Sequence, residues 1–428
     1  MHSKFITEQE FIASFKFRKD VTYKQFAKEL SFLSYNAKTH TNTISPITYF
    51  TKNNSHDRLK RLPLFTKNLY KLLVKEPEEF LGSWFRHFGT MTEDLPFYFQ
   101  MENNLIYNGG DSAFLGNYNA KYGRLCRQLN FESAYNTKKT NHRVTEKANV
   151  YSILELLHLM FEKFVLERNI GLPLFFDKVC ELDDPKDGYM KFWKFLMTFI
   201  PKPSILNPYT YREILNTLFE GDTVFAPCMS WNSPQLAFYS TNFTRFISTD
   251  VIPSVVNNGN TLHSDWKEWN ESRTCLFPED KTVDLYCCPS EQLQKRHKFI
   301  DKYRNEVDAV LFCPPYFDLE EYDGGEQSTE SFPNYEAWMK GYWEATVNTC
   351  VKVMKSGARF GFIVSNYYHD CGKRLVPVSD DMGKVCEAHP DLRLVKKYKI
   401  LWSSFKSDSK TEKHKDGNFE DLWLFEKR

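Results

Sequence analysis

The chain has 428 residues, of which 42% are hydrophobic and 26% charged, with a net charge of +1. This composition is ordinary for a folded chain, and the length favours two domains. Mean hydropathy is −0.52, and no apolar stretch is long enough to cross a bilayer, which excludes a membrane span. The first ten residues carry two acids and no apolar run. We therefore expect an intracellular, cytoplasmic protein with no membrane partner.

Charge and cysteine usage narrow the function classes further. Residues 1–150 hold 22 Lys and Arg against 14 Asp and Glu, whereas residues 151–428 hold 34 against 41. A basic part followed by an acidic part is typical of a chain that holds a polyanion such as nucleic acid, although solvated surface lysines give the same counts. The ten cysteines show no C-x-x-C pair and no zinc-type Cys/His spacing. This pattern predicts reduced thiols in a reducing compartment and no metal.

The first two hundred residues predict a mainly helical region. Apolar residues recur at helical spacing over residues 21–33, 62–88 with a break at Pro77, 149–168 and 188–200. The proline-rich run at 201–208 ends the last of these helices. We place the domain boundary there, with a basic helical region at 1–204 and a second domain at 205–428.

A basic segment rich in Asn, Gly and Tyr spans residues 104–145. We interpret it as the best candidate for contacts with nucleic-acid phosphates, and a long solvated connection is the alternative. Its candidate substrate-binding residues are Lys121, Arg124, Arg127, Lys138 and Lys139.

The sequence pattern changes after residue 208, where segments typical of strands begin to alternate with segments typical of helices. After a predicted helix at 211–220, apolar runs predict strands at 223–225, 244–248, 283–287, 309–312 and 360–364, with helices at 290–305 and 335–354 between them. This alternation predicts an α/β, doubly wound, mostly parallel sheet with its ligand at the carboxyl ends of the strands. Two last strands, at 392–402 and 421–427, predict a closing antiparallel pair.

The strongest local signal is DAVLFCPPYFDLEEY at residues 308–322. A buried strand runs directly into Cys313, Pro314, Pro315 and Tyr316. Because the prolines lack an N–H group and stiffen the turn, they leave backbone carbonyl oxygens as free acceptors. Acceptors beside the rings of Tyr316 and Phe317 suit an exocyclic amino group on a stacked base.

These residues resemble the S-adenosylmethionine-dependent amino-methyltransferases, whose catalytic tetrapeptide is Asp, Asn or Ser followed by Pro-Pro-Tyr. The likeness extends to a phage and bacterial group of nucleic-acid methylases with an SPPYFDLE-like motif. This chain offers CPPYFDLEEY, then NYEAWMKGYW, then KSGARFGFIVSN. The resemblance covers roughly residues 205–428 and implies a Rossmann-like methyltransferase sheet, with a viral or phage origin.

The resemblance also implies roles for individual residues. The family's Asp-Pro-Phe-x-Gly-Trp-Gly-x-Arg loop aligns with residues 226–234, so the implied contacts to S-adenosylmethionine come from Pro227, Ser230, Trp231 and Asn232. The implied ribose-binding acid is Asp250, and Glu291 stands at the adenine side. The implied catalytic residues are Cys313, Pro314, Pro315 and Tyr316, and no metal is required.

Four positions depart from the family pattern. Ser230 and Asn232 stand where the family has glycines, and Ala226 replaces the leading acid. We expect both side chains to crowd the cofactor and to weaken its binding, because glycine lets the backbone approach a ligand closely. Cys313 replaces the polar first residue of the tetrapeptide, and sulfur accepts hydrogen bonds poorly.

Two functions from different classes follow. The first is methyl transfer to adenine N6 or cytosine N4 in DNA or RNA, with amino hydrogens accepted by Cys313 and the Pro314 carbonyl and the base stacked on Tyr316. The second is a pseudoenzyme, a methyltransferase-like protein that binds nucleic acid or a protein partner as a structural subunit. Single residues also have plain alternatives: Asp250 as a turn acid, Glu291 as a helix cap, and Cys313 as a small buried hydrophobe.

Overall fold

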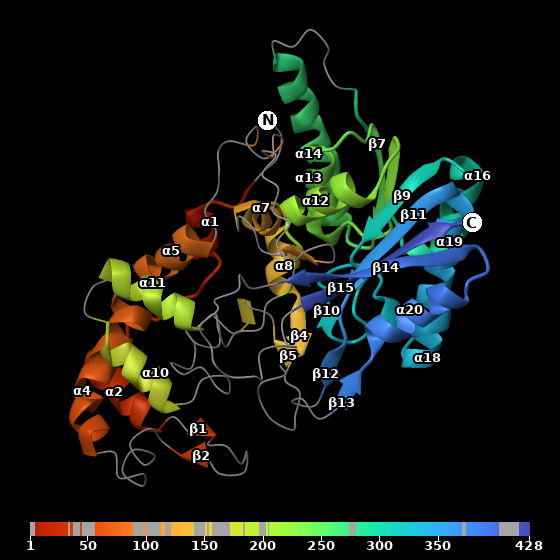
Figure 1. The fold of residues 1–428 in the computed structure, drawn as a ribbon. Coiled ribbons are helices and arrows are strands. Elements are labelled where there is room, and N and C mark those ends of the chain that lie inside the picture. The colour runs from red at the N-terminus through yellow and green to blue at the C-terminus, as the bar shows by residue number, and fades with distance from the viewer. Residues whose placement is uncertain are drawn as a thin grey trace.

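The C-terminal half is organised around an eight-stranded sheet with helices on both faces (Figure 1). The computed structural model describes residues 5–32, 35–36, 43–44, 56–88, 95, 99, 101, 113–115, 121–140, 150–151, 154–155, 172–182, 185–196, 203, 205–273, 280–369, 374–401 and 419–428. The strands of this sheet are β3 (Ala113–Leu115), β6 (Thr223–Ala226), β7 (Arg245–Asp250), β8 (Thr282–Cys287), β9 (Val307–Phe312), β11 (Met354–Val364), β14 (Leu392–Leu401) and β15 (Phe419–Lys427).

The strand order is β3-β14-β15-β11-β9-β6-β7-β8. Neighbours from β8 to β11 pair in parallel, and β15 runs antiparallel to both β11 and β14. The chain builds outward from β6 through β7 to β8 and then crosses to β9 on the other side of β6. The order therefore reverses between β6 and β9, which is where open α/β sheets bind their ligands. This is the doubly wound, mostly parallel sheet predicted for residues 205–428, with β3 added from an earlier part of the chain, and the closing antiparallel pair is confirmed.

Helices cover both faces of the sheet, as apolar strands such as β9 require. Figure 1 shows α12 (Pro208–Leu218), α13 (Ser233–Phe238) and α14 (Pro253–Ser272) on one side, and α16 (Phe299–Tyr303), α19 (Ala345–Val353) and α20 (Val378–Ala388) on the other. The remaining helical segments here are η3 (Ser230–Asn232), η4 (Ser290–Gln292), α15 (Leu293–His297), α17 (Ser328–Ser331), α18 (Tyr335–Trp338) and the π-helix η5 (Met339–Glu344). The helix predicted at 290–305 is broken at Lys298, whose φ is +50°.

The N-terminal region is mainly helical, as predicted. Its helices are α1 (Glu8–Ala13), α2 (Tyr23–Phe32), α4 (His56–Tyr70), the π-helix η1 (Lys71–Lys75), α5 (Pro77–Phe88), α10 (Leu172–Cys180) and α11 (Pro185–Leu196). They enclose a core of their own, in which Phe80 stacks on Trp193 at 4.3 Å between ring centroids. The predicted break at Pro77 is confirmed. Most of the helix predicted at 149–168 lies outside the described residues, and its predicted start is wrong, because Val150–Tyr151 forms a short strand instead.

Two further helices, α7 (Lys121–Leu129) and α8 (Phe131–Asn136), join the helical region to the sheet (Figure 1). Leu125 and Leu129 belong to the core of the sheet, whereas Phe131 and Tyr135 belong to the helical core. The alternative of a long solvated connection is therefore wrong for the described residues 121–136. Apolar side chains at helical spacing within a basic, Asn-rich segment account for this difference.

Short ladders complete the structure. β10 (Glu320–Glu321) follows the tetrapeptide and pairs with β4 (Lys138–Thr140), which pairs in turn with β5 (Val150–Tyr151). The other two-stranded ladders join β1 (Tyr35–Asn36) to β2 (Thr43–Ile44) and β12 (Tyr367–His369) to β13 (Arg374–Val376). None of the described helices has the length and apolar character needed to span a bilayer.

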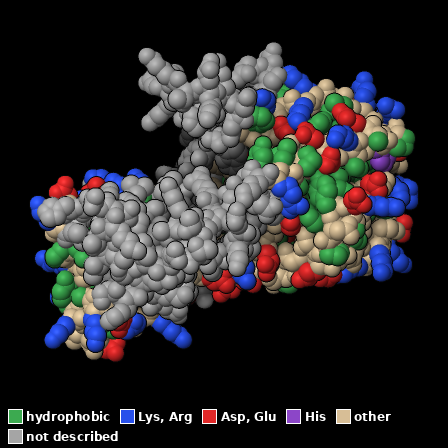
Figure 2. All heavy atoms as spheres, turned by 90° about the horizontal axis from the view of Figure 1, so that it is seen from below, with side chains coloured by type: hydrophobic (Ala, Val, Ile, Leu, Met, Phe, Trp, Pro, Cys, Tyr) green, Lys and Arg blue, Asp and Glu red, His purple; other side chains and the backbone are tan. Residues whose placement is uncertain are grey.

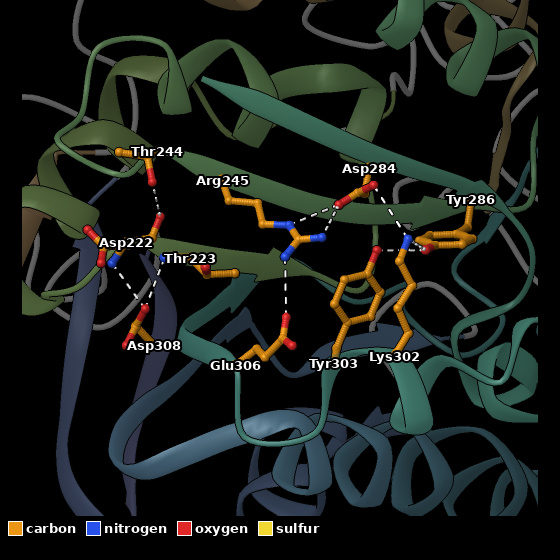
Figure 3. Close-up of polar contacts among 10 residues, drawn as sticks. All are labelled: Asp222, Thr223, Thr244, Arg245, Asp284, Tyr286, Lys302, Tyr303, Glu306 and Asp308. Carbon is orange, nitrogen blue, oxygen red and sulfur yellow. Dashed lines mark hydrogen bonds and ion pairs between the residues drawn. The ribbon is translucent and has the colours of Figure 1, made fainter. Parts of the chain in front are cut away.

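The amino-terminal edge of the parallel strands is closed by paired charges (Figure 3). Arg245 lies 2.9 Å from Asp284 and 3.3 Å from Glu306. Further along β8, away from this edge, Lys302 lies 3.6 Å from Asp284 and donates a hydrogen bond to the Tyr286 hydroxyl at 3.0 Å. Because these charges already have partners within the chain, this edge is tied together rather than open to a charged ligand.

Candidate functional site

A cavity of about 220 Å³ lies at the opposite edge, beyond the carboxyl ends of β6 to β9. The residues predicted from the sequence that line it are Pro227, Ser230, Trp231, Asp250, Glu291, Cys313, Pro314, Pro315 and Tyr316. Asn232 and Phe317 do not line it. The fold thus gathers the loops after four strands around one cavity at the reversal of strand order, where a ligand is expected.

The loop after β6 has an unusual backbone. Ser230, Trp231 and Asn232 have φ angles of +42°, +52° and +65°. This left-handed region costs most L-residues roughly 1–2 kcal/mol each, which is why glycine is common there. The loop therefore adopts a backbone conformation typical of glycine although none of these three residues is glycine. The Ser230 hydroxyl lines the cavity and donates a 3.5 Å hydrogen bond to the Cys313 carbonyl, which ties the loop to the tetrapeptide.

The position of Asn232 corrects the prediction that both polar side chains crowd the cofactor. Its side chain is only 1% exposed and points into the protein, where its amide donates to Gln235 Oε1 at 3.1 Å and to the Val255 carbonyl at 3.2 Å. Only Ser230 of the two replaced glycine positions meets the cavity. Sequence alignment gives the position of a side chain along the chain, but not its direction in a left-handed turn.

Asp250 ends β7 with its carboxyl group at the cavity wall. Its Oδ1 accepts a hydrogen bond from the Ile252 N–H at 3.1 Å, so it serves as a turn acid and lines the cavity at once. Burial raises the pKa of Asp250 to about 6, against the opposing effect of nearby backbone N–H groups. A buried carboxylate of this kind gains from a ligand that donates hydrogen bonds to it.

Glu291 lies on the short helical turn Ser290–Gln292 that follows β8. No side chain caps this turn, so Glu291 does not have the helix-cap role considered for it. Burial raises the pKa of its carboxyl group, and Arg296 partly offsets that rise.

Cys313 and the prolines lie directly beyond the end of β9. Burial, and after it the Glu420 carboxylate, raises the pKa of the Cys313 thiol well above its usual range, so the thiol is neutral near pH 7. A neutral thiol is neither a nucleophile nor a strong acceptor. Within the described part of the chain, no hydrogen bond reaches the Pro314 carbonyl oxygen, which therefore remains an acceptor beside the cavity.

Tyr316 is held by two elements far away in the sequence. Its hydroxyl accepts a hydrogen bond from the Ser365 N–H at 3.0 Å and donates one to Glu420 Oε1 at 2.9 Å. Its ring meets the Tyr367 ring edge-on at 6.0 Å. Glu420 and Ser365 also line the cavity. Ser365 lies in the quoted segment KSGARFGFIVSN, but no role in the site was predicted for it, and nothing in the sequence marks Glu420, because β15 reaches this edge only in the folded sheet.

The described ionisable side chains that line the cavity are all acidic or weakly acidic. Among the described residues its lining includes acids but no lysine, arginine or histidine; the acids are Asp250, Glu291, Glu320, Glu326 and Glu420. The charge of Glu326 is compensated by a bidentate salt bridge, in which both carboxylate oxygens lie 2.7 Å from the guanidinium nitrogens of Arg296. The rest leave the wall acidic, which favours a cationic ligand or one rich in hydrogen-bond donors. No cluster of metal-ligating side chains occurs in the described ranges.

The predicted substrate-binding residues whose side chains the structure describes do not line this cavity. Phe317 packs against Tyr335 and Trp338, with ring centroids 5.4 and 5.6 Å apart. Arg124 and Arg127 are half-buried on α7, and Lys138 lies 3.9 Å from both Glu155 and Glu321. The side chains of Lys121 and Lys139 lie outside the described part. On the face in Figure 2, basic and acidic side chains are interspersed over the described surface.

No family model matches this sequence, and no curated protein matches it. Part of the chain is similar to solved methyltransferase structures. TrmN from Thermus thermophilus is 10% identical, with 52% of this chain covering 49% of that one at a TM-score of 0.32. An rRNA methylase from Streptococcus thermophilus is 11% identical, with 53% covering 99% at a TM-score of 0.31.

A SAM-dependent O-methyltransferase from Thermotoga maritima is 12% identical, with 55% of this chain covering 70% of that one at a TM-score of 0.31. This chain thus spans about half the length of TrmN. TM-scores this low carry no functional argument.

Proposed function

We propose that the cavity binds S-adenosylmethionine and that the chain transfers a methyl group to an exocyclic amino nitrogen of a base, adenine N6 or cytosine N4, in DNA or RNA. The observation that carries this proposal is the meeting of the Ser230–Asn232 loop, Asp250 and the Cys313–Tyr316 tetrapeptide around one acidic cavity. Residues 205–428 would perform the chemistry, and the basic region 1–204 would add contacts to the nucleic acid.

The residues present fit much of the proposed cofactor. The Asp250 carboxylate would accept hydrogen bonds from the ribose hydroxyl groups, and Glu291 would face the adenine. The Trp231 Nε1–H is buried without a hydrogen-bond partner among the described residues, so the loop holds an unused donor. The acidic wall would favour the positive charges of the cofactor. When bound, S-adenosylmethionine supplies an electrophilic methyl group.

This chain's own residues would position the amino nitrogen and stabilise the positive charge that develops on it, and the nitrogen would then lose one proton to solvent. The Pro314 carbonyl would accept one amino hydrogen, and Cys313, held neutral, would contribute only a weak contact. The Tyr316 ring, fixed by Ser365 and Glu420, would stack on the base. Most of the rate would come from alignment of nitrogen and methyl carbon, since transfer is sensitive to small misplacements.

A second candidate is a methyltransferase-like subunit that binds nucleic acid or a protein partner without turnover. The observations that favour it are the missing carboxylate at Ala226, which is buried at 0% exposure, and the neutral thiol of Cys313. The first removes a partner that the resemblance implies for the amino group of the cofactor, and the second weakens an acceptor that it implies for catalysis.

Calorimetric titration with S-adenosylhomocysteine, followed by transfer from labelled S-adenosylmethionine to mixed-sequence DNA and RNA, tests the proposal. The proposed enzyme binds the ligand and labels an amino nitrogen of one base. Binding without labelling favours the second candidate, and absence of binding overturns both the cofactor and the reaction.

A further inference from the structure

The left-handed loop after β6 is supported by a side chain from the N-terminal region. Asn130 lies between α7 and α8 and is only 2% exposed. Its Nδ2 donates to the Trp231 carbonyl at 3.1 Å and to Asn232 Oδ1 at 2.9 Å. It thus contacts two of the three loop residues with positive φ, although about one hundred positions separate it from them along the chain.

A second contact fixes which way the Asn130 amide points. Asn258, on α14, donates from Nδ2 to the Leu129 carbonyl at 2.8 Å and to Asn130 Oδ1 at 3.0 Å. Since a carbonyl only accepts, the Asn258 NH₂ group must face this side, and Asn130 must present its oxygen to it. The Asn130 NH₂ group is therefore directed at the Trp231 carbonyl. The two asparagines form a chain of hydrogen bonds from α14 to the loop.

We infer that Asn130 is a positioning residue for the ligand-binding loop, and this inference rests on the proposed function. It holds Trp231 and Asn232 in the left-handed conformation that glycine would otherwise make accessible. The loop keeps Ser230 and Trp231 at the cavity wall, so its conformation sets how much of the protein is ready to bind. A loop that samples other conformations lowers the apparent affinity by the fraction that is competent.

Support from Asn130 explains how the loop keeps its backbone without glycine. The left-handed turn is unfavourable on its own, and buried hydrogen bonds from a rigid helix junction offset that cost. The N-terminal region thereby has a role in the site that does not depend on nucleic-acid contacts. The sequence contains no sign of this role, because Asn130 lies far from every motif of the resemblance.

The test uses the full chain with Asn130→Ala and Asn130→Asp. The Asp variant keeps the shape and the acceptor for Asn258 and, in its ionised form, has no donor toward the loop. We expect both variants to bind S-adenosylhomocysteine at least about tenfold more weakly in calorimetry, as the loss of one or two buried hydrogen bonds implies. The matched control is Asn136→Ala, which removes a 3.0 Å hydrogen bond to Asp323 but none to the loop, and it should keep wild-type affinity.

Two further readouts separate positioning from general destabilisation. Hydrogen–deuterium exchange of the ligand-free chain should rise in the peptide covering residues 226–239 and stay unchanged in β9. In an Asn232→Gly background, where left-handed backbone is freely accessible and the side-chain acceptor is absent, Asn130→Ala should cost less than about threefold in affinity.

Each failure has a separate meaning. Wild-type protein that binds no S-adenosylhomocysteine makes the proposed function wrong, while exchange in residues 226–239 still decides whether Asn130 holds the loop. Wild-type binding that survives in Asn130→Asp overturns the inference and leaves the proposed function standing. An equal loss with and without Asn232→Gly also overturns it, because the effect would then be independent of the loop.

Discussion

Replacing Asp250 by Asn should weaken ligand binding and stabilise the ligand-free protein. The variant keeps an oxygen for the Ile252 N–H, so the turn after β7 is preserved. It removes the charge that would accept hydrogen bonds from a ribose. Loss of a hydrogen bond to a charged group costs about 1.5–3 kcal/mol, or roughly ten- to hundredfold in Kd for S-adenosylhomocysteine.

Stability should change in the opposite direction. Burial raises the pKa of Asp250 from 3.8 to about 6, so the folded state binds this proton more tightly than the unfolded state does. Stability is therefore lost as pH rises from about 4 to about 6, and the loss persists at neutral pH. The difference of about two pKa units corresponds to at most about 3 kcal/mol, which Asp250→Asn should recover at pH 7 but not at pH 4.

The same pKa gives the wild-type affinity a defined pH dependence. If only the carboxylate binds well, affinity is highest above pH 7 and about tenfold lower at pH 5, one unit below the pKa. Calorimetry from pH 5 to pH 8 and urea denaturation at pH 4 and 7 measure both effects. Glu306→Gln is the matched control, because it removes an acid at the opposite edge of the sheet. An unchanged Kd in Asp250→Asn, or the same pH slope in variant and wild type, would refute this reasoning.

Three other predictions concern the loop, the tetrapeptide and the basic segment. Ser230→Gly should tighten S-adenosylhomocysteine binding several-fold in calorimetry, because Ser230 has a φ of +42° and lines the cavity; weaker binding would contradict this. Tyr316→Phe should slow methyl transfer at least about tenfold with little change in cofactor Kd, because the ring is no longer anchored to Ser365 and Glu420; equal losses in both would place Tyr316 in cofactor binding instead. Fluorescence anisotropy against salt should show a flatter log–log slope of nucleic-acid binding after Gln replaces Lys121, Arg124, Arg127, Lys138 and Lys139, by about 0.7–0.9 for each phosphate that is no longer neutralised. An unchanged slope would remove this segment from the interface.

Much of the sheet was predictable because strands such as β6 and β9 are rich in apolar residues. In β9 the run VDAVLF leads into two prolines, and both the strand and its end follow from local sequence. The tetrapeptide, the loop after β6 and Asp250 all follow parallel strands, so the rule for open α/β sheets brings them together at one cavity.

What could not be predicted depends on contacts between distant parts of the chain. Glu420 reaches Tyr316 across 104 positions, because β15 is antiparallel and brings its first residues to the carboxyl edge of the parallel strands. Asn232 was expected in the cavity, yet a left-handed turn directs it inward. The buried face of α7 was not recognised, because its apolar residues stand among basic and polar ones. The helical spacing of those apolar residues decides the burial, not the average polarity of the segment.

Side chains of α7 pack in the core of the sheet, and side chains of α8 pack in the helical core. This arrangement limits where the chain could be cut or recombined. A cut at residue 204 would separate the sheet from its edge strand β3, from Leu125 and Leu129 in its core, and from Asn130 at its loop. The sheet is therefore not a module that a single junction at residue 204 could separate intact from the rest of the chain. The smallest unit that keeps the sheet intact is discontinuous in sequence, because it includes residues 113–136 as well as the strands of the sheet after residue 205.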